Sequence, residues 1–392
     1  MKIVQINSVC GSGSTGKICV AVSELLTKQR VENYILYALG NSNDPLAKKY
    51  MSSGDARLQA LKSRIFGNYG FQSKKATKRL IRELDEILPD IVHLHNLHSH
   101  NAHLGLLFSY LKEKKIKVFW TFHDCWAFTG YCTYYDMVGC DRWKTSCKNC
   151  PAKKRFSWFF DRSHDLLLKK KQLFSGLDLT IITPSQWLAD QVKQSFLNEY
   201  EVKVIHNGID LSVFRPRQSD FREKYHLENK FIILGVAFKW ETRKGLDVFL
   251  ELNQRLDDRY QIVLVGTNEA IDKQLPENII SIHRTQNQVQ LSEIYSAADV
   301  LVNPTREENF PTTHMEALAC GTPVIAFNTG GCGEMLDHTC GCVVDKNDVD
   351  ALEEKIIYTC STTPYTAQNC VSKAYEFEAD KKFEEYSLLY FS

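Results

Sequence analysis

Short hydrophobic runs alternate with amphipathic stretches along nearly the whole chain. The runs are rich in β-branched residues and apolar at consecutive positions, which is typical of parallel strands buried on both faces. They lie at residues 3–6, 91–94, 118–121, 179–182, 202–205, 231–236, 262–265, 300–302 and 323–326. The spacing between them predicts helices over residues 18–28, 77–87, 184–196 and 248–256. This alternation predicts an α/β fold with helices on both faces of parallel sheets.

A turn-rich segment interrupts this rhythm near the middle of the chain, at Asn207-Gly208-Ile209-Asp210 and again at Phe214-Arg215-Pro216-Arg217. Each half contains several predicted strands, and 392 residues are enough for two domains. We therefore expect two Rossmann-like, doubly wound domains facing across a cleft, at residues 1–206 and 207–372. Residues 373–392 are expected to form a helix that packs back toward the first domain.

Composition narrows the class of protein. The chain carries 48 Lys and Arg against 47 Asp and Glu, so a strongly basic nucleic-acid binder and an acidic tail are excluded. Its 44% hydrophobic content excludes wholesale disorder. No apolar run reaches the roughly 18–20 residues of a membrane helix, and no signal-peptide core follows Met1. We expect a cytoplasmic protein in which the 13 cysteines are reduced thiols or metal ligands.

A glycine-rich turn follows the first predicted strand, with the sequence Gly11-Ser12-Gly13-Ser14-Thr15-Gly16-Lys17. It imitates a nucleotide-binding P-loop, but Ile18 stands where a P-loop needs a Ser or Thr hydroxyl for magnesium. Glycines between a strand and a helix let backbone N–H groups approach an anion closely. We therefore expect an anion-binding turn and keep a P-loop kinase as an alternative.

Two further patterns invite a metal interpretation. The first is a histidine series, His93, His95, His98, His100 and His103, which lies at the carboxyl end of a predicted strand. Alternate strand positions do not by themselves form a ligand shell, so hydrogen-bonded or cleft-lining imidazoles are favoured over a metal site. The second is the pair Asp348 and Asp350, which begins directly before a helical run, where N-capping explains it better.

The most specific pattern follows the strand predicted at residues 300–302. Glu308 and Glu316 are separated by seven residues, in a segment that leaves the strand and enters a helix. Glu316 can brace this loop or reach a ribose diol, because a carboxylate can accept two hydroxyl hydrogen bonds. The helix N-terminus adds positive potential for a diphosphate. Together they predict a nucleotide site.

These residues resemble the GT-B glycosyltransferases of family 4. The two glutamates are followed by Ala-Leu-Ala-Cys-Gly-Thr-Pro-Val-Ile-Ala at 317–326 and Thr-Gly-Gly-Cys-Gly-Glu at 329–334. Four more blocks come in the family's order: the glycine-rich turn, Thr121-Phe122-His123-Asp124, residues 204–216, and residues 235–245. The resemblance spans essentially the whole chain. It implies a retaining sugar transferase that uses a nucleotide-sugar donor.

The resemblance also implies roles for single residues. Lys239, where relatives usually carry Arg, and Lys244 would clamp the donor diphosphate. Glu316 would bind the ribose, Glu308 would contact the sugar or orient its loop, and His123 would lie near the sugar. The remaining donor contacts would come from Gly13, Phe310, Pro311, Thr312 and Arg284. Lysine in place of arginine still neutralises phosphate but loses the bidentate geometry.

The expected chemistry follows from charge. Loss of a nucleoside diphosphate builds negative charge on the leaving phosphate, which lysines and helix N-termini can stabilise without magnesium. We therefore expect no catalytic cofactor. The expected partners are a nucleotide-sugar donor and a saccharide or lipid-linked saccharide acceptor for bacterial surface polysaccharide, with no nucleic acid. A GT-B epimerase or phosphorylase, and a zinc-containing binding module, are the alternatives.

A cysteine-rich insert at residues 125–151 lies outside the family pattern. Cys132, Cys140, Cys147 and Cys150 have the spacing C-x7-C-x6-C-x2-C. Four thiolates could close a tetrahedral structural zinc site and order a loop-like stretch. Buried or free thiols, and disulfides, are the alternatives.

Two tracts of the first half are locally basic. Residues 57–82 contain eight Lys and Arg and no acid, and residues 153–160 (Lys-Lys-Arg-Phe-Ser-Trp-Phe-Phe) interleave cations with aromatic residues. One interpretation is a peripheral surface that contacts an anionic membrane at the inner face of the plasma membrane and receives a lipid-linked acceptor. The other is a solvated helix face whose aromatic residues belong to the core.

Overall fold

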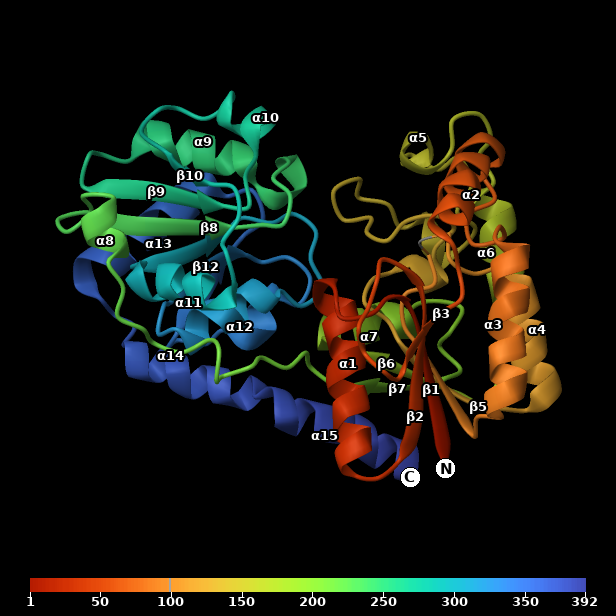
Figure 1. Ribbon diagram of the computed structural model, residues 1–392. Coiled ribbons are helices and arrows are strands. Elements are labelled where there is room, and N and C mark those ends of the chain that lie inside the picture. The colour runs from red at the N-terminus through yellow and green to blue at the C-terminus, as the bar shows by residue number, and fades with distance from the viewer. Residues whose placement is uncertain (99) are drawn as a thin grey trace. The chain divides into compact units, whose positions relative to one another are not determined.

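The computed structural model describes residues 1–98 and 100–392, which divide into two compact units. Unit 1 comprises Met1–His206 and Lys382–Ser392, and unit 2 comprises Asn207–Lys381 (Figure 1). The first break coincides with the turn-rich segment of the sequence. Residues 373–381, expected with the C-terminal helix, belong to unit 2 instead, and the chain returns to unit 1 at Lys382.

Unit 1 is built on a sheet whose described strands all pair in parallel. Its strands are β1 (Lys2–Val9), β2 (Glu32–Leu39), β3 (Ala47–Lys49), β4 (Ile91–Leu94), β5 (Lys117–Thr121), β6 (Leu179–Thr183) and β7 (Glu201–Val204). The spatial order is β3-β2-β1-β4-β5-β6-β7, so the chain winds outward in one direction from β1 and in the other from β4. At such a switch point the carboxyl ends of the strands leave a crevice for ligands.

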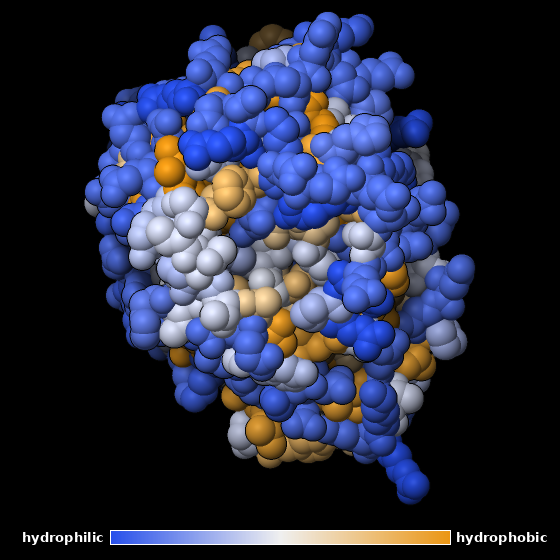
Figure 2. All heavy atoms as spheres, turned by 90° about the vertical axis from the view of Figure 1, so that its left-hand side faces the viewer, coloured by the Kyte–Doolittle hydropathy of each residue, from blue (hydrophilic) through white to orange (hydrophobic). Residues whose placement is uncertain are grey.

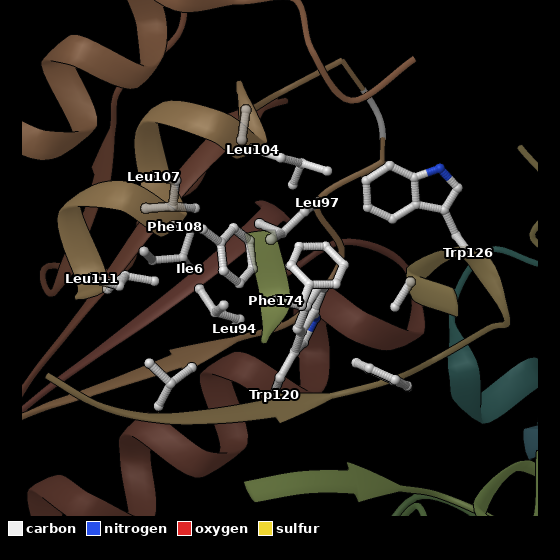
Figure 3. Packing of buried hydrophobic residues seen from close by; sticks show 14 of the residues in the cluster. Ile6, Leu94, Leu97, Leu104, Leu107, Phe108, Leu111, Trp120, Trp126 and Phe174 are labelled. Carbon is white, nitrogen blue, oxygen red and sulfur yellow. The ribbon is translucent and has the colours of Figure 1, made fainter. Parts of the chain in front are cut away.

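Helices lie between these strands and at the end of the chain. They are α1 (Gly13–Lys28), α2 (Ser53–Phe66), α3 (Lys74–Ile87), α4 (Leu104–Lys114), α5 (Lys153–Phe156), α6 (Ser163–Phe174), α7 (Gln186–Lys193) and α15 (Ala379–Phe391). All of them except α2 and α5 bury apolar residues. Figure 3 shows the stripe that α4 presents to the sheet, Leu104, Leu107, Phe108 and Leu111, at helical spacing. The Phe108 ring lies 4.5 Å from that of Phe174 of α6 and 5.3 Å from that of Trp120 of β5. Helices α4 and α6 therefore pack in one hydrophobic cluster with Phe122 and Trp126, which follow β5.

Unit 2 repeats the plan with a second parallel sheet. Its described strands are β8 (Phe231–Val236), β9 (Tyr260–Val265), β10 (Ile280–Ile282), β11 (Val300–Asn303), β12 (Val324–Phe327) and β13 (Gly341–Val344). The order β10-β9-β8-β11-β12-β13 places a switch point between β8 and β11. Ligands of such sheets bind outside the carboxyl ends of the two switch strands.

Helices cover both faces of this sheet. They are α8 (Phe221–Lys224), α9 (Leu246–Arg255), α10 (Glu269–Asp272), α11 (Gln288–Ala297), α12 (Thr312–Ala319), α13 (Val349–Thr362) and α14 (Ala367–Ala374). Successive residues of β8 enter opposite cores: Ile232 packs in the cluster of α11 and α12, and Ile233 in that of α9 and α13. The predicted α/β fold with two doubly wound parallel sheets is therefore confirmed. Asp348 caps α13 by accepting from the Ala351 N–H at 2.9 Å, as its position predicted.

The surface is mostly hydrophilic where Figure 2 shows it, with hydrophobic residues in smaller groups. Such groups are ordinary on folded proteins and carry no conclusion by themselves. None of the helices in the described part of the chain has the length and hydropathy that a membrane crossing requires.

Candidate functional site

The loops that leave β8 and β11 meet at the switch point of unit 2. The Arg306 N–H donates to the Arg243 carbonyl at 2.9 Å, which joins the two loops through their backbones. Gly245 has φ +77°, and a Cβ there would lie 2.5 Å from the Pro304 carbonyl oxygen. Only glycine allows this approach, so the Arg-Lys-Gly sequence serves the geometry of the site as well as its charge.

Lys244 and Glu308 form the central ion pair of this edge, with 2.5 Å between Nζ and Oε2. Their side chains are only 20% and 16% exposed. Burial alone would raise the pKa of Glu308, but Lys244, the Asn309 N–H and Arg243 outweigh it and hold the pKa below its ordinary value. Glu308 is therefore a carboxylate at neutral pH, and it fixes the Lys244 ammonium beside the carboxyl ends of β8 and β11.

Lys239 stands apart from this pair. Its side chain is 71% exposed, and its Nζ lies 3.1 Å from Glu241 Oε2. Glu241 also pairs with Arg243, whose guanidinium donates to the Glu307 carbonyl at 3.1 Å. The structure thus brings Lys244 and Glu308 together but connects Lys239 to the edge only through Glu241 and Arg243.

Two glycines seat the loop that carries Glu308. Gly330 has φ +56°, and a Cβ there would lie 1.8 Å from the Glu308 carbonyl oxygen. The Gly331 N–H donates to the Asn309 carbonyl at 2.8 Å. The Thr-Gly-Gly sequence after β12 is therefore part of the loop's support, because any side chain at residue 330 would displace Glu308.

The residues that follow Glu308 lead into α12. Phe310 is buried against the ring of Phe377 at 5.8 Å. Pro311 is the N-cap of α12 and has no N–H, so it fixes the backbone rather than donating to a phosphate. Thr312 begins the helix, whose N-terminus offers positive potential. Of these three predicted donor contacts, only Phe310 and Thr312 carry an amide hydrogen.

Glu316 lies on α12 within reach of α11. The Tyr295 hydroxyl, which is buried, donates to Glu316 Oε2 at 2.8 Å. This hydrogen bond orients the half-buried carboxylate. Arg284 follows β10 at the edge of the sheet and is exposed, two strands away from β8.

Unit 1 places the glycine-rich turn at its own switch point, between β1 and the start of α1. Gly11 and Gly13 have φ +70° and +63°, conformations that other residues rarely adopt. A Cβ at Gly16 would lie 3.1 Å from the Gly11 nitrogen, so the turn is tight. Gly13 is the first residue of the 16-residue helix α1. The turn has the features of an anion site.

A chain of hydrogen bonds runs through unit 1 to His123. Gln5 Nε2 donates to the Cys19 carbonyl at 2.9 Å, so Gln5 Oε1 is the acceptor that faces His95 Nε2 at 3.2 Å. His95 Nε2 must then carry the proton, which leaves His95 Nδ1 as an acceptor for His123 Nε2, also at 3.2 Å. His123 is thereby held in the Nε2–H tautomer.

These imidazoles are neutral. Burial lowers the pKa of His93 to about 3 and that of His123 to about 4, and it lowers the pKa of His95 well below its usual range. His93 contacts Thr121 at 2.8 Å and the Tyr390 hydroxyl at 2.5 Å. The hydrogen-bonded interpretation of these histidines therefore fits the structure.

The cysteines of the insert share one small cavity. Cys132, Cys140, Cys147 and Cys150 line it, with the Gly130 N–H donating to Cys147 Sγ at 3.3 Å. Within residues 1–98 and 100–392, however, no group of three or more histidine, cysteine or acidic side chains is arranged so that it could hold a metal ion. The thiols converge without forming a ligand shell in this arrangement, and the structural zinc stays a prediction.

Three residues of the site escaped the sequence reasoning. Arg243 lies within the motif at residues 235–245 without a role of its own there, and no sequence motif assigns a role to Glu241 or Tyr295. Their roles depend on contacts with Glu307, Lys239 and Glu316. The only available signal was the position of Glu241 and Arg243 directly before Lys244.

Two family models match the chain. One is described as Glycosyltransferase Family 4 and matches residues 17–213, and the other, Glycosyl transferases group 1, matches residues 217–377. The putative colanic acid biosynthesis glycosyl transferase WcaC of Escherichia coli (strain K12) is 25% identical over 368 residues. That match covers 89% of this chain and 88% of WcaC. A D-inositol 3-phosphate glycosyltransferase of a Mycobacterium species is 27% identical over 162 residues, 38% of this chain and 37% of that protein.

Solved structures share the fold over the whole length. Sucrose-phosphate synthase from Thermosynechococcus elongatus superposes with a TM-score of 0.72 at 16% identity, covering 99% of this chain and 98% of that one. Anabaena HepE in complex with UDP gives a TM-score of 0.69 at 15% identity, covering 99% of each chain. At this identity the likeness concerns the fold.

Proposed function

The chain belongs to glycosyltransferase family 4, and from that premise we propose that it moves a sugar from a nucleoside-diphosphate donor to a saccharide acceptor with retention of anomeric configuration. The observation that carries the proposal is the Lys244–Glu308 pair at the carboxyl ends of β8 and β11. A buried carboxylate holds the lysine in place before a ligand arrives. The cation therefore needs little reorganisation when negative charge develops near it.

The donor half of the site suits a nucleoside diphosphate. Lys244 and the N-terminus of α12 offer positive charge for the phosphates, and Lys239 adds an exposed cation paired with Glu241. Glu316, oriented by Tyr295, offers a carboxylate to the ribose hydroxyls. HepE, which has the same fold, has been crystallised with UDP, which supports a uridine nucleotide among the donors to be tested.

We propose that departure of the diphosphate needs no divalent metal. The leaving charge can be balanced by Lys244, Lys239 and the helix N-terminus. Asp348, the first residue of the Asp-x-Asp pair, caps α13. Activity should therefore persist in EDTA.

The acceptor is proposed to be a growing saccharide, including one linked to a lipid. WcaC is named for colanic acid biosynthesis and covers most of this chain, which supports a role in polysaccharide synthesis. A lipid-linked acceptor would place the enzyme at a membrane surface as a peripheral protein.

The test is donor hydrolysis by the purified protein over a panel of UDP-, GDP- and ADP-sugars, with and without EDTA. Proton NMR of the first sugar released reports its anomeric configuration before mutarotation. We expect one donor class to turn over with retention. Lys244→Ala should abolish most of that turnover, whereas Lys224→Ala, an exposed lysine of α8 in the same unit, should not. Inversion, or equal activity of Lys244→Ala and the wild type, would contradict the proposal.

A further inference from the structure

An exposed surface of unit 1 joins large hydrophobic side chains to cations, and the donor chemistry does not use it. Half of this surface is α2. Only Ser63 of this helix is buried, whereas Leu58, Leu61 and Phe66 are each 47% exposed. A helix of a globular protein normally buries its apolar stripe against the core. Helix α2 instead presents apolar residues to the surroundings.

The other half is the segment Trp158–Phe160, three successive aromatic residues that are 54%, 64% and 50% exposed. The segment is anchored just before them: Ser157 is buried, and the Phe156 ring stacks on Tyr131 at 5.5 Å. The exposure of Trp158, Phe159 and Phe160 therefore follows from an ordered backbone.

The two halves form one surface. The Trp158 N–H donates to the Arg64 carbonyl at 2.8 Å, which ties the segment to the last turn of α2. Gly67 ends that helix with φ +66°, and a Cβ there would lie 2.8 Å from the Tyr131 hydroxyl and 3.0 Å from the Phe160 carbonyl. Glycine at this position permits the contact. We call α2 and residues 153–160 together the aromatic-basic surface.

Cations surround the exposed apolar groups. Exposed on the two segments are Arg57, Lys62, Arg64, Lys154 and Arg155. The acids nearby are engaged elsewhere: Asp55 pairs with Arg79 at 3.3 Å, and Asp161 accepts from the Cys150 and Ser163 N–H groups at 2.7 and 3.0 Å. The surface therefore carries a net positive charge although the whole chain has a formal charge of only +1.

We propose that the aromatic-basic surface docks on an anionic lipid bilayer. Aromatic rings partition to the headgroup level of a membrane, and lysine and arginine beside them are attracted to anionic lipids. A polyanion such as RNA would explain the cations, but it would leave Leu58, Leu61 and Phe66 in water. The inference deepens the proposed lipid-linked acceptor, because docking would hold the enzyme where that acceptor lies.

Vesicle flotation tests the proposal with the full chain. We expect flotation with vesicles of phosphatidylcholine and phosphatidylglycerol, and little with phosphatidylcholine alone. Trp158→Ser/Phe159→Ser/Phe160→Ser and Arg57→Glu/Lys62→Glu should each weaken binding by about tenfold or more. The matched controls are Tyr358→Ser/Tyr375→Ser, exposed aromatic residues of unit 2, and Lys28→Glu/Lys193→Glu, exposed lysines of unit 1. Both controls should bind as the wild type does.

A second measurement locates the contact. Trp158 is exposed, whereas the other tryptophans are buried or half-buried. Lipids brominated in the acyl chain should quench the fluorescence of the wild type but not that of Trp158→Phe. Thermal melting shows whether each variant is folded.

Donor hydrolysis, measured without vesicles, separates this proposal from the proposed function, because the surface variants should keep wild-type hydrolysis. Active protein that does not float, or surface variants that float like the wild type, would overturn membrane docking alone. Equal binding of the wild type to polyuridylic acid, lost in the same variants, would overturn it in favour of a nucleic-acid partner.

Discussion

The two switch points of this protein are built on the same topology and filled with opposite chemistry. In unit 2, the carboxyl ends of β8 and β11 carry charged side chains that neutralise one another, with Lys244 held by Glu308. In unit 1, the switch strand β4 and its neighbour β5 are followed by neutral imidazoles linked by hydrogen bonds, with His123 held by His95, and the other switch strand, β1, leads into the glycine-rich turn. A shared fold therefore sets where a ligand would lie, and the side chains decide whether that edge of the sheet is charged or neutral.

The largest expected effect concerns the charged edge. Lys244→Ala should lower kcat/KM for donor hydrolysis by about 10²-fold or more, because the cation that we propose to stabilise the leaving diphosphate is lost. Steady-state kinetics over the donor panel measure it. Lys239→Ala should have a smaller effect and lower kcat/KM by less than about tenfold, because an exposed cation is screened by solvent. Equal losses would contradict this order and would mean that Lys239 contributes as much as Lys244.

The neutral edge should respond differently to pH. His123→Asn should lower kcat by about tenfold or more, as loss of a positioned hydrogen-bonding group does. Because burial lowers the pKa of His123 to about 4, the wild-type imidazole is neutral throughout pH 5–8. The ratio of wild-type to variant activity should therefore stay constant over that range. A ratio that changes with a midpoint near pH 6.5 would show that His123 titrates there.

The hydrogen bond from His123 to His95 gives a further test of the neutral edge, in which His95 acts as a positioning residue. His95→Ala removes the acceptor of the His123 Nε2–H, so His123 should populate both tautomers and kcat should fall several-fold. Nitrogen-15 NMR of the histidine side chains reports the tautomer independently of activity. His95→Gln restores an acceptor and is the conservative control. An unchanged His123 spectrum in His95→Ala would refute the relay.

The smallest expected effect is on the free energy of unfolding and concerns Lys170, a residue of unit 1. Lys170 is buried and donates to the Trp126 and Thr129 carbonyls at 2.6 and 2.9 Å. Burial lowers the pKa of Lys170 to about 7, although the nearby Cys147, Asp124 and Cys132 act to raise it. Between this value and the ordinary lysine pKa the unfolded chain binds more protons, so the lysine contributes stability that rises with pH. The free energy of unfolding of the wild type minus that of Lys170→Met should therefore be more positive at pH 9 than at pH 6. Urea titrations at both values measure it, and a difference that shrinks with pH would refute the assignment.

Much of the architecture could be predicted from the sequence because the buried strands are continuous hydrophobic runs. The strands β2, β3 and β13 were not predicted. The strand β2 opens with Glu32 and Asn33, and Asn33 is buried through hydrogen bonds to Ser23 and Thr27 that no pattern reveals. The sequence indicated which residues belong to the candidate site, but it did not indicate which of them contact one another. Lys239 and Lys244 look equivalent in the sequence, and only the fold pairs Lys244 with a carboxylate 64 residues away.

The return of the chain to unit 1 has a consequence for how the protein is assembled. Tyr390 of α15 supplies a hydrogen-bond partner of buried His93, and Ser387 contacts Gln29. A fragment ending at residue 206 would lack that hydroxyl and also the rings of Tyr386 and Tyr390, which pack against the imidazole. Unit 1 therefore begins at the N-terminus but is complete only when residues 382–392, which follow all of unit 2 in the sequence, have packed against it.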